Sequence, residues 1–210
     1  RLLATAALGL ATPALAQGPA AQAKSDPASA AEAPRPQLVL AVSVDQLSAD
    51  LFAQYREHFT GGFARLLTGA VFPSGFQSHA ATETCPGHST LLTGVHPARN
   101  GIVANSWFEP DGPRGTTSIY CAEDAADPAS SARNPVVSAR NLKVPTLGEM
   151  MKTVNAATRN VAVSAKDRAV MMMGGHKIDA AWWWKAGSFV SFKDRAATPA
   201  VQAVNAKAAA

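Results

Sequence analysis

The sequence predicts an α/β protein, and three observations lead to that class. Residues 38–44 (LVLAVSV) and 160–164 (NVAVS) are short runs of β-prone apolar residues, as in buried parallel strands. Apolar residues at helical spacing lie between the two runs, at 48–59, at 62–67 and after Pro145. The resulting order of strand, helix, strand and helix is typical of α/β folds.

Length and composition indicate a globular chain without a nucleic-acid surface. The 210 residues suffice for one domain or part of a larger one, and 47% of them are hydrophobic against 16% charged. Lys and Arg number 19 against 15 Asp and Glu, a net charge of +4, but they are scattered rather than interleaved with aromatic residues. Nucleic-acid binding is therefore not predicted, whereas small anionic substrates are compatible with this charge.

The N-terminal residues predict export. Arg1 opens an apolar run through Leu15 that ends in Ala14-Leu15-Ala16, the pattern of a secretory signal peptide over residues 1–16. We therefore expect a periplasmic or secreted protein, with no membrane span once the signal is removed. Residues 17–36, rich in Ala, Pro, Gln, Ser and Glu, are expected to form a flexible linker, so the folded part should comprise residues 37–210.

The first predicted strand, residues 38–44, ends at Asp45. Ligand sites of open α/β sheets form at the carboxyl ends of strands, so Asp45 stands where a metal-binding carboxylate would lie. An ordinary turn residue or helix cap is the alternative.

Residues 82–94 (TETCPGHSTLLTG) are a polar turn that runs into a helix. We expect Pro86 to be the first helical residue. Thr84 would then lie just ahead of the helix, near unpaired backbone N–H groups that suit an anion such as phosphate. Two interpretations stay open for Thr84: an N-cap, or a reactive hydroxyl in an anion site.

The remaining elements are expected in loops, short strands and helices. In chain order they are an extended segment at 70–76, a loop-like region at 109–141 with a strand at 118–121, a helix that starts at Pro145, a hairpin of 180–185 and 188–192, and a weak helix over 198–210. Cys85 and Cys121 could form a disulfide in an oxidising compartment, or both could be buried thiols. The three tryptophans at 182–184 favour packing over a binding platform.

Several of these pieces together resemble the alkaline phosphatase superfamily. The matching residues are Asp45 after the first strand, Thr84-Cys85-Pro86-Gly87-His88, the following L-T-G-x-x-P-x-x-x-G-I run at 92–102, and Asn105. The phosphodiesterase/nucleotide pyrophosphatase-like branch, whose nucleophile is a threonine, is the best match. Lys166-Asp167-Arg168 resembles the Lys-x-Arg pair of the threonine-type bacterial alkaline phosphatases in that branch. The resemblance runs from about residue 37 to at least 192, and implies a three-layer sandwich around a mostly parallel sheet, incomplete in this chain.

The resemblance also implies roles for individual residues. Asp45 and Thr84 would be metal ligands in a site that holds two Zn²⁺ ions in the complete protein. Thr84 would be the nucleophile and form a phosphothreonine intermediate, since a metal can activate its weakly nucleophilic hydroxyl. Asn105, Lys166 and Arg168 would hold the phosphoryl oxygens. The two cations suit the dianion of a phosphate monoester, which favours an alkaline phosphatase over a phosphodiesterase.

One part of the family's pattern is not found here. The family completes its zinc site with three further histidines and two aspartates, and the residues after Arg168 do not offer that set. His88 is expected to organise the turn rather than bind metal. We therefore expect this chain to be the N-terminal part of a longer enzyme, inactive by itself. The alternatives are a phosphodiesterase or nucleotide pyrophosphatase, and a catalytically inactive truncated domain.

Overall fold

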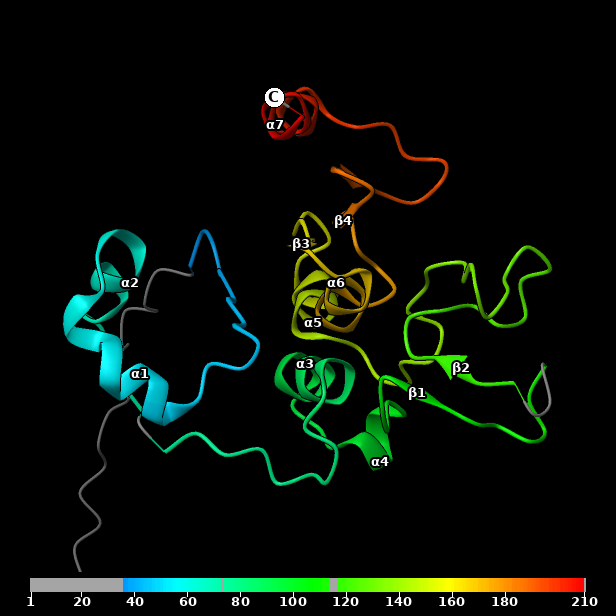
Figure 1. Cartoon of the computed structure of the whole chain (residues 1–210), viewed down its shortest axis with the longest axis horizontal. Coiled ribbons are helices and arrows are strands. Elements are labelled where there is room, and N and C mark those ends of the chain that lie inside the picture. The colour runs from blue at the N-terminus through cyan, green and yellow to red at the C-terminus, as the bar shows by residue number, and fades with distance from the viewer. Residues whose placement is uncertain (1–35, 73, 114–116, 210) are drawn as a thin grey trace, which may run out of the picture. The chain divides into compact units, whose positions relative to one another are not determined.

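The structure is a computed structural model that describes residues 36–72, 74–113 and 117–209 (Figure 1). The chain divides into two units, residues 1–41 and 42–210. In the first unit only residues 36–41 are described, and they form no helix or strand. The predicted signal peptide lies outside the described residues, as does the predicted linker except for Pro36.

The second unit alternates short helices and strands. In chain order the elements are α1 (Ala49–Tyr55), the 3-10 helix η1 (Arg56–His58), α2 (Gly61–Leu66), α3 (Thr84–Thr93), α4 (Pro97–Asn100), β1 (Ser106–Trp107), β2 (Ile119–Tyr120), α5 (Leu147–Val154), β3 (Val161–Ser164), α6 (Asp167–Gly174), β4 (Ala180–Lys185), β5 (Ser188–Val190) and α7 (Pro199–Ala208).

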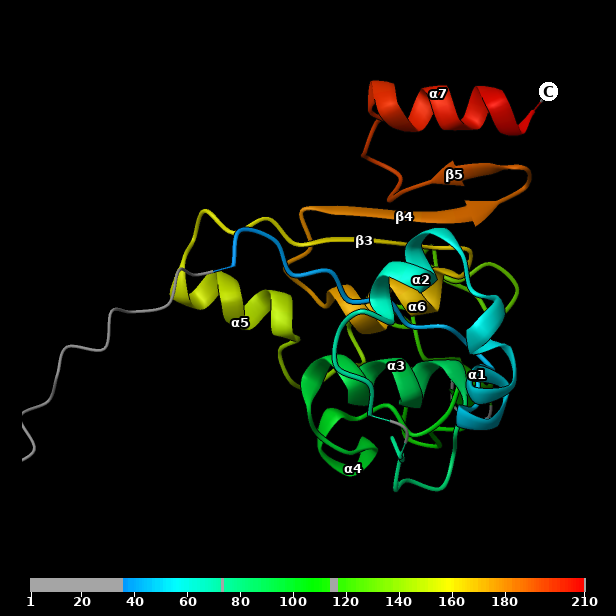
Figure 2. The same cartoon turned by 90° about the vertical axis from the view of Figure 1, so that its left-hand side faces the viewer.

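The larger sheet has the strand order β3-β4-β5 (Figure 2). β3 pairs with β4 in parallel, with Val161 opposite Ala180, whereas β4 and β5 form an antiparallel hairpin. The hairpin turns at Ala186 and Gly187, whose φ angles of 49° and 85° are those of the tight turns that match strand twist. The predicted strand at 160–164 and the predicted hairpin are thus confirmed.

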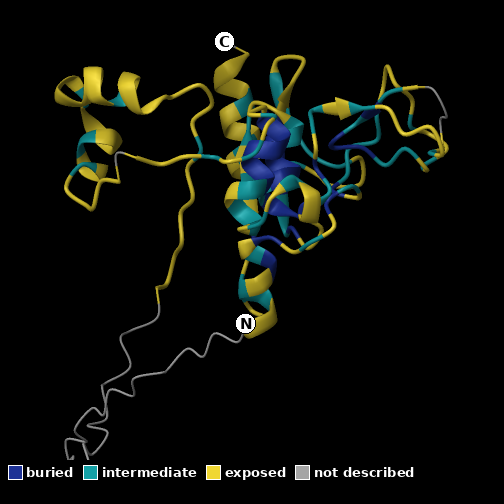
Figure 3. Cartoon of the chain, turned by 90° about the horizontal axis from the view of Figure 1, so that it is seen from below, coloured by how far each residue is buried: buried dark blue, intermediate teal, exposed yellow. Residues whose placement is uncertain are grey.

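Two helices, α6 and α3, connect the sheet to the candidate site. α6 contacts both β3 and β4, and α3 packs on α6. The core between them contains Met171, Met172 and Trp183, together with Cys85 and Cys121. Buried residues, dark blue in Figure 3, lie on α3, α6 and β4, whereas β3, α1 and α2 have none. Trp182 and Trp183 are buried and Trp183 belongs to this core, so packing is confirmed for these two, whereas Trp184 is 37% exposed.

The predicted strand at 38–44 is wrong for the structure as described. These residues form no strand, and their apolar side chains are exposed, with Leu38 at 79% and Leu40 at 77%. A strand needs a partner to satisfy its backbone groups. Among the described residues, no strand pairs with this segment. β3 forms as predicted, but Val163 on it is 65% exposed rather than buried.

Two predicted helix starts need correction. α3 begins at Thr84, not at Pro86, and its N-cap is Glu83. Proline is tolerated throughout the first turn, where its missing N–H would have no intrahelical partner, so its position did not fix the start. α5 begins at Leu147 rather than Pro145, because Thr146 forms a capping box with Glu149.

Candidate active site

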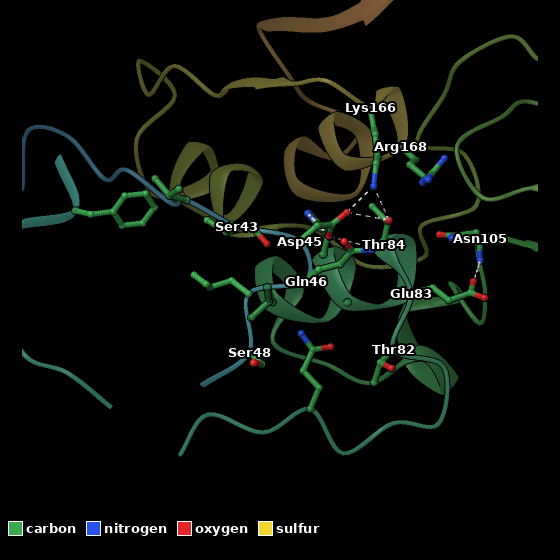
Figure 4. Close-up of a pocket in the computed structure, with 18 of the residues that line it drawn as sticks. Ser43, Asp45, Gln46, Ser48, Thr82, Glu83, Thr84, Asn105, Lys166 and Arg168 are labelled. Carbon is green, nitrogen blue, oxygen red and sulfur yellow. Dashed lines mark hydrogen bonds and ion pairs between the residues drawn. The ribbon is translucent and has the colours of Figure 1, made fainter. Parts of the chain in front are cut away.

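One cavity of about 910 Å³ in the second unit brings together all five residues singled out from the sequence. Asp45, Thr84, Asn105, Lys166 and Arg168 line it, although they come from four separate segments of the chain. Figure 4 shows the side chains of Asp45, Thr84 and Lys166 converging on one another. The chain therefore folds so that a hydroxyl, a carboxylate, an amide and two cations face a common space.

Thr84 is held by its backbone, which leaves its hydroxyl available. As the first residue of α3 it is 9% exposed, and Glu83, not Thr84, is the N-cap. The interpretation of Thr84 as an N-cap is therefore wrong. Its Oγ1 donates to Asp45 Oδ2 at 3.2 Å and accepts a hydrogen bond from Lys166, so one lone pair of the oxygen has no partner among these contacts.

Asp45 and Lys166 form an ion pair beside that hydroxyl. Lys166 Nζ lies 2.6 Å from Asp45 Oδ2 and 3.5 Å from Thr84 Oγ1. The hydrogen bond from Lys166 lowers the pKa of the Asp45 carboxyl, since it stabilises the charged form. Asp45 therefore stays ionised, and an ammonium group lies within reach of the threonine oxygen.

His88, one turn along α3, contacts both Thr84 and Asp45. Its Nδ1 lies 2.7 Å from the Thr84 carbonyl oxygen, so this nitrogen carries the hydrogen and donates. Its Nε2 is 3.7 Å from Asp45 Oδ1, and the side chain is only 8% exposed. These contacts agree with an organising role in the turn.

The Asn105 amide is oriented by the start of α3. Its Oδ1 accepts the Cys85 backbone N–H at 2.9 Å, which fixes which end of the amide is oxygen. The backbone N–H of Asn105 donates to Glu83 Oε2 at 2.6 Å. No described residue accepts a hydrogen bond from Asn105 Nδ2, so this NH₂ group is left to donate to a ligand.

Lys166 and Arg168 lie where β3 gives way to α6. Lys166 is the N-cap of α6, and Arg168 is its second residue. Arg168 Nη1 donates to the Tyr120 hydroxyl at 3.5 Å, while its Nε is buried without a partner among the described residues. This arrangement presents two cations at the carboxyl end of a parallel strand, where α/β folds place their ligands.

The donors present make only part of a metal site. Asp45 Oδ2 and Thr84 Oγ1 lie 3.2 Å apart and could share a cation. However, the described residues contain no group of three or more His, Cys, Asp or Glu side chains placed to hold a metal. Zinc sites use at least three protein ligands, so these residues do not complete one.

Sequence reasoning missed two features of the site and left a third open. These are the Glu83 carboxylate on the Asn105 backbone, the Tyr120 hydroxyl beside Arg168, and the pairing of Cys85 with Cys121, which form a disulfide. The sequence left open whether Cys85 and Cys121 pair, because a separation of 36 residues does not show whether the two cysteines lie close together. Nothing in the sequence connects Tyr120 with Arg168, 48 residues later.

No helix among the described residues is long and apolar enough to cross a membrane.

Comparison with known proteins gives a consistent family. The family model of type I phosphodiesterase / nucleotide pyrophosphatase matches residues 39–208. Alkaline phosphatase PhoK of Sphingomonas sp. is 55% identical over 172 residues, which are 81% of this chain and 31% of PhoK. Alkaline phosphatase PafA of Elizabethkingia meningoseptica is 33% identical over 166 residues, which are 75% of this chain and 30% of PafA.

The crystal structure of PafA also resembles this chain. It superimposes with a TM-score of 0.72 at 31% identity, over 83% of this chain and 35% of that one. The prediction of an alkaline-phosphatase-like α/β fold, incomplete in this chain, is thereby confirmed. The chain spans about a third of the length of the relatives it matches. With its cavity, its fold and these relatives in agreement, the chain belongs to the type I phosphodiesterase / nucleotide pyrophosphatase family.

Proposed function

We propose that the complete protein is an alkaline phosphatase that hydrolyses phosphate monoesters through a phosphothreonine at Thr84. The observation that carries this proposal is the Thr84 hydroxyl, which lies within hydrogen-bond distance of both Asp45 and Lys166 and faces the cavity shared with Arg168. The relatives named alkaline phosphatases support the reaction class.

The residues of this chain suggest how the reaction proceeds. Thr84 Oγ1 would lose its proton and form a bond to phosphorus as the bond from phosphorus to the ester oxygen breaks; the ester oxygen takes up a proton and leaves as the alcohol. Water would then cleave the phosphothreonine, releasing phosphate and restoring the hydroxyl. The Lys166 ammonium, 3.5 Å from Thr84 Oγ1, favours negative charge on that oxygen.

Phosphate recognition would involve three side chains. Arg168 offers a planar set of N–H donors, Lys166 a point charge, and Asn105 its free NH₂ group. Two cations match a monoester dianion better than a diester, which carries less charge and a second organic group. A solved variant of PafA carries substitutions of a threonine, an asparagine, a lysine and an arginine, the same four residue types.

Zinc and export belong to the same proposal. Asp45 and Thr84 would contribute to a site for two Zn²⁺ ions whose other ligands lie outside the described residues. When bound, Zn²⁺ would lower the pKa of the threonine hydroxyl. The apolar N-terminal run supports a periplasmic or secreted protein.

Substrate preference tests the proposal. We expect the complete gene product to hydrolyse 4-nitrophenyl phosphate with a higher kcat/KM than bis(4-nitrophenyl) phosphate. Arg168→Ala should lower kcat/KM for the monoester by at least about tenfold more than it lowers kcat/KM for the diester, because it removes a positive charge that only the dianion needs. Arg159→Ala, on an arginine outside the cavity, is the matched control.

A preference for the diester would overturn the proposal and favour the second candidate, a phosphodiesterase or nucleotide pyrophosphatase. The family model that matches residues 39–208 bears that name and supports this alternative.

A further inference from the structure

Tyr120 occupies a position from which it can control Arg168 without touching a substrate. It ends β2, which pairs with β1 so that Tyr120 lies opposite Ser106, the residue after Asn105. Tyr120 does not line the cavity, whereas Arg168 does. The tyrosine therefore reaches the site only through another side chain.

Its hydroxyl joins two consecutive residues of α6. Tyr120 Oη donates to Asp167 Oδ1 at 2.6 Å and accepts from Arg168 Nη1 at 3.5 Å. The same Asp167 oxygen accepts the Arg168 backbone N–H at 2.6 Å. Since the hydroxyl hydrogen is committed to Asp167, the oxygen turns its lone pairs toward the guanidinium. No other described residue bonds the Arg168 guanidinium, and its Nε is buried without a partner.

We propose that Tyr120 is a positioning residue that holds the Arg168 guanidinium in the orientation needed to bind phosphate. The inference rests on the function proposed above. An arginine gains its advantage over lysine from a fixed, planar presentation of two N–H groups, and small errors in such positioning cost large factors in rate. Holding one N–H of Nη1 leaves its second N–H and the two of Nη2 for phosphoryl oxygens.

The protonation of Tyr120 suits this role. Burial, followed by the hydrogen bond to Asp167, raises the pKa of the Tyr120 phenol to about 12. Asp167 and Arg168 are the charged groups that face it. The hydroxyl thus keeps its hydrogen at alkaline pH, where a phenol of ordinary pKa near 10 begins to ionise.

The backbone of Tyr120 is fixed to the rest of the site. The next residue, Cys121, is bonded to Cys85, which follows Thr84. The Cys121 N–H donates to the Asn105 carbonyl at 3.0 Å, and the Cys85 N–H donates to the Asn105 side chain. The tyrosine that orients Arg168 is therefore tied to the same frame as the nucleophile and Asn105.

A double-mutant cycle in the metal-loaded complete protein tests the inference. Tyr120→Phe removes the hydroxyl and keeps the ring. We expect it to lower kcat/KM for 4-nitrophenyl phosphate by about tenfold and to have no further effect in an Arg168→Ala background. Asp167→Asn should act in the same direction. Tyr55→Phe, on the chain's other tyrosine, is the control and should change nothing.

Affinity for inorganic phosphate, measured by calorimetry, gives a readout independent of turnover. It should weaken in Tyr120→Phe and not change further when Arg168 is already replaced. If Tyr120→Phe weakens phosphate affinity equally with Arg168 present and with Arg168 replaced, the role of Tyr120 is merely structural and the inference is overturned. A Tyr120→Phe protein with unchanged phosphate affinity and kcat/KM would also overturn it. A protein that binds phosphate with this pattern but hydrolyses no monoester would refute the proposed function alone. A protein that does neither would refute both.

Discussion

At the scale of single residues, Thr84 shows how its place in a helix determines which groups its side chain contacts. Threonine is a favoured N-cap residue, but here the N-cap is Glu83 and Thr84 is the first residue of the helix. The Thr84 hydroxyl is consequently directed at Asp45 and Lys166. The residue type and the helix could be read from the sequence. The choice between capping and reactivity could not, because it depends on contacts with residues 39 and 82 positions away.

Asp179 offers a test of side-chain electrostatics away from the site. Its carboxylate accepts the Asn160 backbone N–H at 2.6 Å and pairs with Lys152 Nζ at 2.7 Å. These contacts, the backbone hydrogen bond first, lower the pKa of Asp179 below its ordinary value of 3.8. A lowered folded-state pKa contributes stability above the unfolded value, and this stability is lost as pH falls through the folded value.

We therefore expect Asp179→Asn to lower the free energy of unfolding at pH 7, with a deficit that shrinks progressively below pH 3.8. Urea unfolding of both proteins across this range measures it. Asp194→Asn, on an exposed carboxylate, is the control. A deficit that stays constant down to pH 2 would show that the ion pair and hydrogen bond are not its source.

At the scale of elements, local sequence patterns predicted correctly those elements whose hydrogen-bond partners lie nearby in the sequence. The hairpin contains both of its paired strands, β4 and β5, and the turn between them, and α3 ends at Thr93 with Gly94 as its C-cap at φ 69°, as a terminal glycine predicts. The segment 38–44 has equally strong β propensity but forms no strand. To form a strand, this segment needs a neighbouring strand to pair with, and the described residues provide none. The β propensity of a segment does not show whether such a neighbour is present.

The disulfide between Cys85 and Cys121 joins the start of α3 to the end of β2. It closes a loop with a sequence separation of 36, and both cysteines are fully buried. A crosslink of that span removes conformational entropy from the unfolded chain worth about 4 kcal/mol. The sequence left open whether these cysteines pair or remain thiols.

Replacing both cysteines by alanine should therefore destabilise the protein by up to about 4 kcal/mol. Guanidinium unfolding with and without a reductant measures the effect. The wild-type protein should lose a similar amount when reduced, whereas the double variant should be insensitive to the reductant. Thiol titration that finds two free cysteines in the unreduced protein would contradict the assignment.

At the scale of the whole molecule, the residues of the site were easier to predict than the contacts between them. The five cavity residues were identified from motifs, and the fold brings all of them to one cavity. The link from Tyr120 to Arg168 depends on how β2 packs near α6, which no local pattern encodes. The remainder of the predicted zinc site is also not among the described residues. The chain covers only 31% of its Sphingomonas relative, so activity is proposed for the complete protein.

The most direct test of the central proposal is to trap the covalent intermediate. The complete protein is mixed with 4-nitrophenyl phosphate, quenched in acid and digested, and the phosphorylated residue is identified by mass spectrometry. We predict phosphate on Thr84 in the wild-type protein and on the substituted residue in Thr84→Ser. Thr84→Ala should carry no phosphate, and its turnover should fall by at least about a thousandfold. Phosphate on another residue, or full turnover by Thr84→Ala, would contradict the assignment of Thr84 as the nucleophile.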